Sequence, residues 1–211
     1  FIVEGEHLVY EAYKEGLLKT ILVRDGYPFM LDVDTIYVND KVLKFLSSLT
    51  TPAPVIGIVE KKVSKKIGNK VIVLDNVQDP GNLGTIIRSA VAFNFDTIIL
   101  SDDTVDLYNP KVIRATQGML FKINFVIGNL VDILTDLQTK KYVIYGTDVV
   151  DGKNIKTIEK SKKFAIIMGN EGNGISTDVK ALCSNFIYIP MNKNCESLNV
   201  AVATSIIMYE L

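Results

Sequence analysis

The chain has 211 residues, of which 48% are hydrophobic and 22% are charged, and its formal net charge is −1. This balance excludes an intrinsically disordered chain, and no apolar run approaches the roughly 20 residues that a membrane span requires. His7, Cys183 and Cys195 share no metal-ligand spacing, so no metal site is expected. The start of the chain is too polar for a signal peptide, and we expect a cytoplasmic protein with reduced thiols. Because residue 1 is Phe rather than Met, we expect further residues to precede it.

Residues 1–60 predict a small α/β unit. Apolar residues recur at helical spacing over Glu6–Leu18 and again over Asn39–Leu49. Short β-branched runs predict strands over Thr20–Val23, Thr35–Val38 and Val55–Val59. The alternation of helices and strands favours a compact sandwich.

A basic decapeptide, KKVSKKIGNK, spans residues 61–70 and holds five lysines and no acid. It separates an acidic first block, with five basic and nine acidic residues, from a third block with thirteen basic and fifteen acidic residues. We interpret it as a linker. Its lysines Lys61, Lys62, Lys65 and Lys66 are candidates for binding RNA phosphates, against the plainer interpretation of a solvated linker.

Residues 71–211 alternate strands and helices more strongly. Apolar runs of strand length, hydrophobic on both faces, occupy Lys70–Leu74, Thr97–Leu100, Tyr142–Thr147, Phe164–Met168 and Phe186–Pro190. Helices are predicted over Leu83–Phe93, Asn109–Thr116, Asn129–Thr139, Thr177–Leu182 and Leu198–Tyr209. This pattern predicts a parallel sheet flanked by helices, with ligands bound beyond the carboxyl ends of its strands.

The first polar loop, residues 75–84, reads DNVQDPGNLG and precedes a helix. A Pro-Gly pair predicts a turn, Asn82 is a candidate N-cap, and Gly84 permits a close backbone approach. Arg88 follows on the same helix and could reach back toward the strand end. Taken singly, a cap and a surface ion pair are the plainer interpretations of Asn82 and Arg88.

The second loop, residues 169–174, reads GNEGNG and follows another predicted strand. Three glycines in six residues permit a tight wrap around a ligand, but the pattern is neither a dinucleotide fingerprint nor a phosphate-binding P-loop. Glu171 could accept hydrogen bonds from backbone amides, from substrate or from Arg88, or it could be an exposed turn acid.

The third segment reads IPMNKNCESLNVAVA over residues 189–203. Ser197 is placed at a predicted helix start, with Asn199 one turn into the helix, and capping is the plainer role for a serine there. The following helix is small and apolar, so it should pack against the sheet.

The three loops in this order, N-x-x-D-P-x-N-x-G-x-x-x-R, then G-x-E-G-x-G, then I-P-M and S-L-N-V-A-V-A, resemble the SpoU (TrmH-like) branch of the SPOUT RNA methyltransferases. The opening FIVEGE is similar to the start of the L30e-like substrate-binding domain of many such enzymes. Between the motifs, residues 114–119 read RATQGM where relatives usually have Arg-Ala-Ser-x-Gly-Ala.

The resemblance implies a SPOUT fold with a C-terminal trefoil knot, a homodimer and S-adenosylmethionine as cofactor. It divides the chain into an L30e-like RNA-binding domain (1–60), the basic linker (61–70) and a methyltransferase domain (71–211). It also implies a set of cofactor-binding residues, which comprises Thr147, Gly169, Ile189, Met191 and Leu198.

For catalysis, the resemblance points to Arg88, assisted by Asn82, Glu171, Ser197 and Asn199. Arginine is a poor base, so the role of Arg88 stays open between phosphate clamp, ribose orienter and proton relay. The implied reaction methylates a ribose 2′-hydroxyl, of ribosomal RNA in preference to transfer RNA. One alternative is a non-catalytic RNA-binding assembly factor with this fold. The other is a nucleotide-dependent enzyme such as a dehydrogenase, but the Asp-Pro in the first loop argues against it because such an enzyme needs a phosphate-binding glycine loop there.

Overall fold

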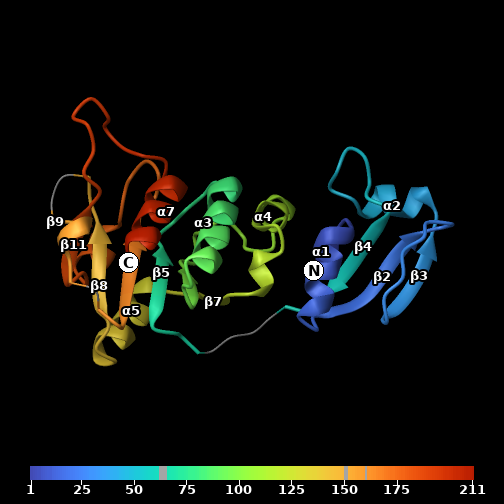
Figure 1. The fold of residues 1–211 in the computed structure, drawn as a ribbon, viewed down its shortest axis with the longest axis horizontal. Coiled ribbons are helices and arrows are strands. Elements are labelled where there is room, and N and C mark those ends of the chain that lie inside the picture. Colours follow the sequence, from blue (N-terminus) through green and yellow to red (C-terminus); the bar gives the residue numbers. More distant parts are fainter. Residues whose placement is uncertain (62–65, 150–151, 160) are drawn as a thin grey trace.

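The computed structural model describes residues 1–61, 66–149, 152–159 and 161–211. It contains two sheets, one built from strands within residues 2–59 and the other from strands within residues 70–188, and the two follow each other along the long axis of the molecule (Figure 1). Two of the predicted RNA-binding lysines, Lys62 and Lys65, lie outside the described residues. No helix within the described ranges is long and apolar enough to cross a membrane.

The first sheet has four strands in the order β1-β4-β2-β3, of which only β2 and β3 are parallel neighbours. Helix α1 packs on one face of the sheet, where its Val9 shares a core with Ile21 of β2. Helix α2 packs on the other face, where its Leu43 shares a core with Ile56 of β4. The elements are β1 (Ile2–Glu4), α1 (Glu6–Lys14), β2 (Leu18–Arg24), β3 (Asp34–Val38), α2 (Asp40–Leu46) and β4 (Val55–Val59).

The prediction for this sheet was wrong in four places, one of which is the start of β2 at Leu18 rather than Thr20. Strand β1 was missed. Helix α1 ends at Lys14 rather than Leu18, because Gly16 takes a left-handed φ of 69° and the next residues enter β2. Helix α2 ends at Leu46 rather than Leu49, because the backbone of Ser47 is extended.

The second sheet has seven strands in the order β7-β6-β5-β10-β8-β11-β9, and all neighbours are parallel. Its strands are β5 (Lys70–Leu74), β6 (Thr97–Leu100), β7 (Asn124–Ile127), β8 (Val143–Thr147), β9 (Lys153–Asn154), β10 (Phe164–Met168) and β11 (Asn185–Tyr188). The predicted parallel sheet is confirmed, although β7 and β9 were missed and β11 ends before Ile189 and Pro190.

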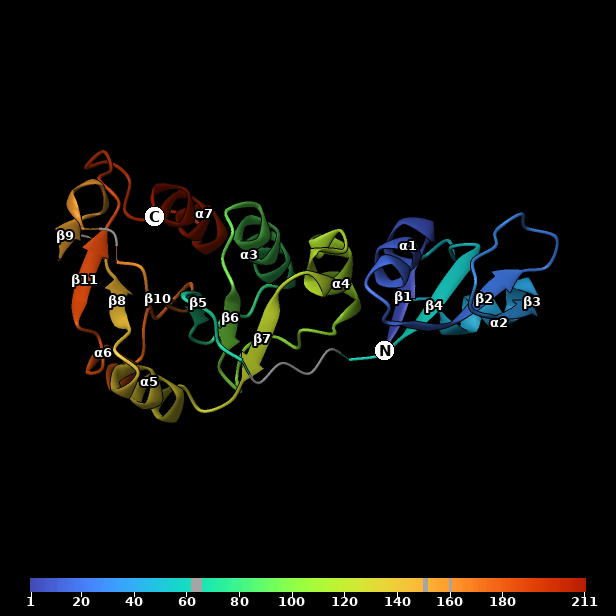
Figure 2. The same ribbon diagram turned by 60° about the horizontal axis from the view of Figure 1, so that its bottom comes forward.

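Helices cover both faces of this sheet (Figure 2). Ile72 and Leu74 of β5 pack toward α3, while Val71 and Val73 face α5, as the alternation of side chains along a strand requires. The helices are α3 (Pro80–Ala92), α4 (Pro110–Thr116), α5 (Leu130–Thr139), α6 (Thr177–Lys180) and α7 (Val200–Glu210), with 3₁₀ turns η1 (Met119–Phe121) and η2 (Ile155–Thr157).

Strand β10 lies between β5 and β8, although it follows both in sequence. Met168 is paired with Leu74, and Ile187 of β11 is paired with Thr147 of β8. The carboxyl ends of β5, β10, β8 and β11 are therefore at one edge of the sheet, and all three polar loops leave from that edge.

Candidate functional site

The first loop begins at the buried carboxylate of Asp75, which accepts a hydrogen bond from the Ser176 amide at 2.7 Å. Helix α3 then starts with Asp79 as its N-cap, since the Asp79 Oδ1 accepts from the Asn82 amide at 2.8 Å. The prediction that Asn82 caps the helix was wrong. Asn82 is the third helical residue, and its carboxamide is free to make other contacts.

The second loop is a closed turn that Asn170 holds together. The backbones of Asn170 and Gly174 are bonded to each other, and the Asn170 Oδ1 accepts from the amides of Gly172 and Asn173. The Asn170 Nδ2 donates to the Asn76 carbonyl at 2.8 Å, which ties this turn to the first loop.

The third segment starts helix α7 later than predicted. Asn199 is its N-cap, because the Asn199 Oδ1 accepts from the amides of Ala201 and Val202. The prediction of a helix start at Ser197 was therefore wrong. Ser197 lies before the helix and lines a cavity instead.

Three of the predicted catalytic residues form one hydrogen-bonded network. The Asn82 Nδ2 donates to the Glu171 Oε1 at 2.9 Å, and the Asn82 Oδ1 accepts from the Asn199 Nδ2 at 2.9 Å. Each residue belongs to a different loop. Glu171 thus pairs with Asn82 rather than with Arg88, which lies further along α3 with an exposed side chain that bonds to no other described residue.

A cavity of about 510 Å³ opens beside this network, at the carboxyl ends of β8, β10 and β11. All five residues predicted to bind the cofactor line it: Thr147, Gly169, Ile189, Met191 and Leu198. Glu171, Ser197 and Asn199 also line it, whereas Asn82 and Arg88 do not. Its size is ordinary for a pocket that encloses a small organic ligand.

The cavity lining leaves backbone groups available to a ligand. Beyond the strand ladders, no backbone hydrogen bond joins Gly169, Ile189 or Leu198 to another described residue, so these amides and carbonyls can meet a ligand. The Thr147 hydroxyl donates a hydrogen bond to the Ile167 carbonyl at 2.8 Å. Asp148 and Val149 also line the cavity and were missed, although their position directly after β8 was a usable signal.

The other candidate groups are not among the residues that line this cavity. Among the described residues, no cluster of three or more His, Cys, Asp or Glu side chains could hold a metal ion. Cys183 and Cys195 are free, and burial raises the pKa of the Cys183 thiol to about 11. Lys61 and Lys66 are exposed, and the Lys61 ammonium lies 4.4 Å from the ring centre of Tyr108.

Comparison with known proteins matches the chain to methyltransferases in sequence and in structure. The SpoU rRNA methylase family model matches residues 69–209. The chain is similar to a 23S rRNA (guanosine(2553)-2′-O)-methyltransferase of Bacillus subtilis, RlmP, with 37% identity over all of this chain and 88% of the relative. An AdoMet-bound rRNA methyltransferase of Sinorhizobium meliloti superposes with a TM-score of 0.87 at 31% identity, over all of this chain and 85% of that one. AviRb from Streptomyces viridochromogenes, solved with AdoMet, superposes with a TM-score of 0.88 at 25% identity, over all of this chain and 88% of that one.

Proposed function

Because the chain belongs to the SpoU rRNA methylase family, we propose that it transfers the methyl group of S-adenosylmethionine to a ribose 2′-hydroxyl of 23S ribosomal RNA. The observation that carries the proposal is the Asn82–Glu171–Asn199 network at the rim of the cavity. It joins all three loops of the motif series at one place.

The cavity would hold the cofactor. Backbone groups of Gly169, Ile189 and Leu198 would bind its adenine and ribose, and the side chains of Thr147 and Met191 would flank them. When bound, S-adenosylmethionine provides an electrophilic methyl group. The protein must then align a ribose hydroxyl with that methyl group, and positioning alone can account for much of the acceleration.

Arg88 and the network would orient the ribose. The exposed Arg88 guanidinium can bind an RNA phosphate without first breaking an ion pair to another described residue. Glu171, Ser197 and Asn199 line the cavity with hydrogen-bonding side chains, and Asn82 is bonded to two of them. Because arginine does not readily give up its proton, we assign Arg88 as a phosphate clamp and ribose orienter rather than as the base.

We assign residues 1–60 as an L30e-like RNA-binding domain, 61–70 as a basic linker whose Lys61, Lys62, Lys65 and Lys66 meet RNA phosphates, and 71–211 as the methyltransferase domain. We further propose the trefoil-knotted threading of the family and a cytoplasmic homodimer. Val202 and Tyr209 of α7, which are 47% and 73% exposed, support a second copy packing on that helix.

The test is methyl transfer from tritiated S-adenosylmethionine to unmodified 23S rRNA, 16S rRNA and transfer RNA, followed by digestion to nucleosides. We expect label on a 2′-O-methyl nucleoside of 23S rRNA, lost in Arg88→Ala and retained in Lys180→Ala, which replaces an exposed cation of α6 that does not line the cavity. Label confined to transfer RNA would reassign the substrate. Cofactor binding without any labelled RNA would favour a non-catalytic assembly factor.

A further inference from the structure

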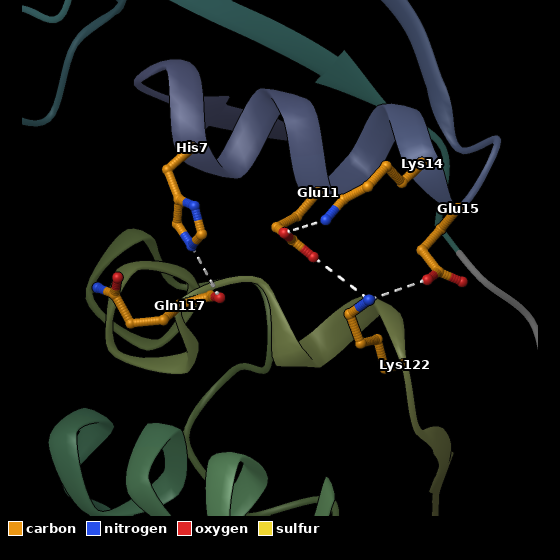
Figure 3. A network of polar contacts seen from close by, with 6 residues as sticks. All are labelled: His7, Glu11, Lys14, Glu15, Gln117 and Lys122. Atoms are coloured by element: carbon orange, nitrogen blue, oxygen red, sulfur yellow. Dashed lines mark hydrogen bonds and ion pairs between the residues drawn. The ribbon is translucent and has the colours of Figure 1, made fainter.

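The two sheets meet at a polar contact between helix α1 and the segment that follows α4 (Figure 3). The Lys122 ammonium lies 3.3 Å from the Glu11 Oε2 and 3.2 Å from the Glu15 Oε1. The His7 Nε2 lies 3.2 Å from the Gln117 carbonyl oxygen. Glu11 is only 7% exposed and also pairs with Lys14, so this carboxylate is held by two cations. We call these contacts the α1–η1 junction.

Apolar packing reinforces the junction. The Phe1 ring lies 4.6 Å from the ring of Tyr108 and 6.4 Å from that of Phe121, measured between ring centres. Buried side chains of the two units form one continuous cluster. The small unit is therefore docked on the large one, and its orientation does not depend on the basic segment alone.

Gly118 makes the close approach feasible. Its φ of +84° is strained for other residues, and a Cβ atom there would lie 2.6 Å from the Glu11 Cγ. The glycine of the RATQGM segment thus lets the chain turn directly beneath the buried carboxylate.

The docking fixes the small unit at the end of the molecule opposite to the cavity. Figures 1 and 2 show α4 and α3 between the first sheet and the strands β8 and β11, whose carboxyl ends border the cavity. An RNA element bound by the small unit would therefore be held at a set separation from the site of methyl transfer.

We propose that the α1–η1 junction positions the RNA, with Lys122 and Gly118 as positioning residues that act through Glu11 and Glu15. This inference rests on the proposed function. The partner it fits is a folded RNA long enough to contact both units at once, because a short oligonucleotide at the cavity would gain nothing from a fixed small unit.

The test compares Lys122→Glu, which places a third carboxylate beside Glu11 and Glu15, with the double variant Glu15→Lys/Lys122→Glu, which restores an opposite-charge pair. Lys180→Glu is the matched control for the charge change. For each protein we would measure KM and kcat on folded ribosomal RNA and on a short oligonucleotide, the Kd for S-adenosylmethionine, and small-angle X-ray scattering. Gly118→Ala gives an independent second perturbation, and thermal melting would check that each variant folds.

We expect Lys122→Glu to raise the KM for folded RNA about tenfold and to expand the scattering profile, with cofactor affinity and oligonucleotide turnover within about twofold of wild type. The double variant should restore the KM for folded RNA and the scattering profile to near those of wild type. Unchanged scattering and KM in Lys122→Glu would overturn the inference. A raised KM without altered scattering and without rescue would also overturn it, because Lys122 would then contact RNA directly. A wild-type protein that labels no RNA would defeat the proposed function instead, while scattering would still report on the junction.

Discussion

The Asn82 Nδ2 lies 2.9 Å from the Glu171 Oε1, although the two residues are 89 positions apart in the chain. The same carboxamide accepts a hydrogen bond from Asn199 through its Oδ1. Asn82 is therefore the central member of a three-residue chain in which it is both donor and acceptor. Any replacement that keeps only one of these capacities should break the network.

Asn82→Asp retains the acceptor and the side-chain shape but loses the donor, and it sets two carboxylates against each other. We expect kcat to fall about 10- to 100-fold while the Kd for S-adenosylmethionine changes less than threefold, since Asn82 does not line the cavity. Single-turnover methyl transfer and isothermal titration calorimetry would measure the two values. Asn129→Asp is the matched control, because Asn129 caps α5 and aspartate is an equally good N-cap. An unchanged kcat in Asn82→Asp would remove this network from the mechanism.

Gly169→Ala should abolish cofactor binding, whereas Gly172→Ala should be tolerated. A Cβ atom at Gly169 would lie 2.2 Å from the Gly174 carbonyl carbon, and that backbone cannot move without opening the turn. At Gly172 the nearest atom is the Asn170 Oδ1, at an ordinary 3.5 Å. Calorimetric titration should show no measurable binding for the first variant and a Kd within about threefold of wild type for the second. Equal affinities would show that the turn is not part of the cofactor site.

Gly84→Ala should destabilise the protein without changing the cavity, because Gly84 does not line it. Gly84 lies where α3 packs on α4, and an added Cβ would meet the Ala115 Cβ at 2.3 Å. Overpacking of this kind typically costs about 1–3 kcal/mol of unfolding free energy. Denaturant unfolding would measure the change, and cofactor affinity below the melting transition should stay near the wild-type value. A variant as stable as wild type would mean that the two helices separate at little cost.

Burial raises the pKa of Cys183 from 9.0 to about 11, so this thiol should remain protonated at pH 8. Iodoacetamide at pH 8 should therefore alkylate the exposed Cys195 first and reach Cys183 only after unfolding, which mass spectrometry of the digest would show. The same shift gives a sign for stability. Above about pH 9 the unfolded thiol ionises while the folded one does not, so the free energy of unfolding should fall as the pH rises from 9 to 11. Replacing Cys183 with Ala should flatten that slope, and an equal slope in both proteins would contradict the assignment.

The sequence by itself determined five of the seven strands of the larger sheet and identified the three polar loops that follow them. Runs such as Phe164–Met168 are apolar on both faces, as a buried parallel strand requires, and the predicted limits of β5, β6 and β10 are those of the structure. The ordered motifs also placed Gly169, Ile189 and Leu198 in one group, and these residues line one cavity. Local signals were weaker where short polar residues compete to cap a helix. Asp79 rather than Asn82, and Asn199 rather than Ser197, occupy the caps, because capping depends on backbone angles that composition does not fix.

Only the tertiary structure decided which distant residues meet. The insertion of β10 between β5 and β8 brings Glu171 to Asn82, and no spacing in the sequence encodes that neighbour. The short strands β7 and β9 form because an open sheet edge lies beside them, so their own sequences carry little signal. The contact of Lys122 with Glu11 and Glu15 likewise exists only because side chains of the two units pack into one core. Local propensity and periodicity act over a few residues, whereas strand order and docking are set by the burial of whole faces.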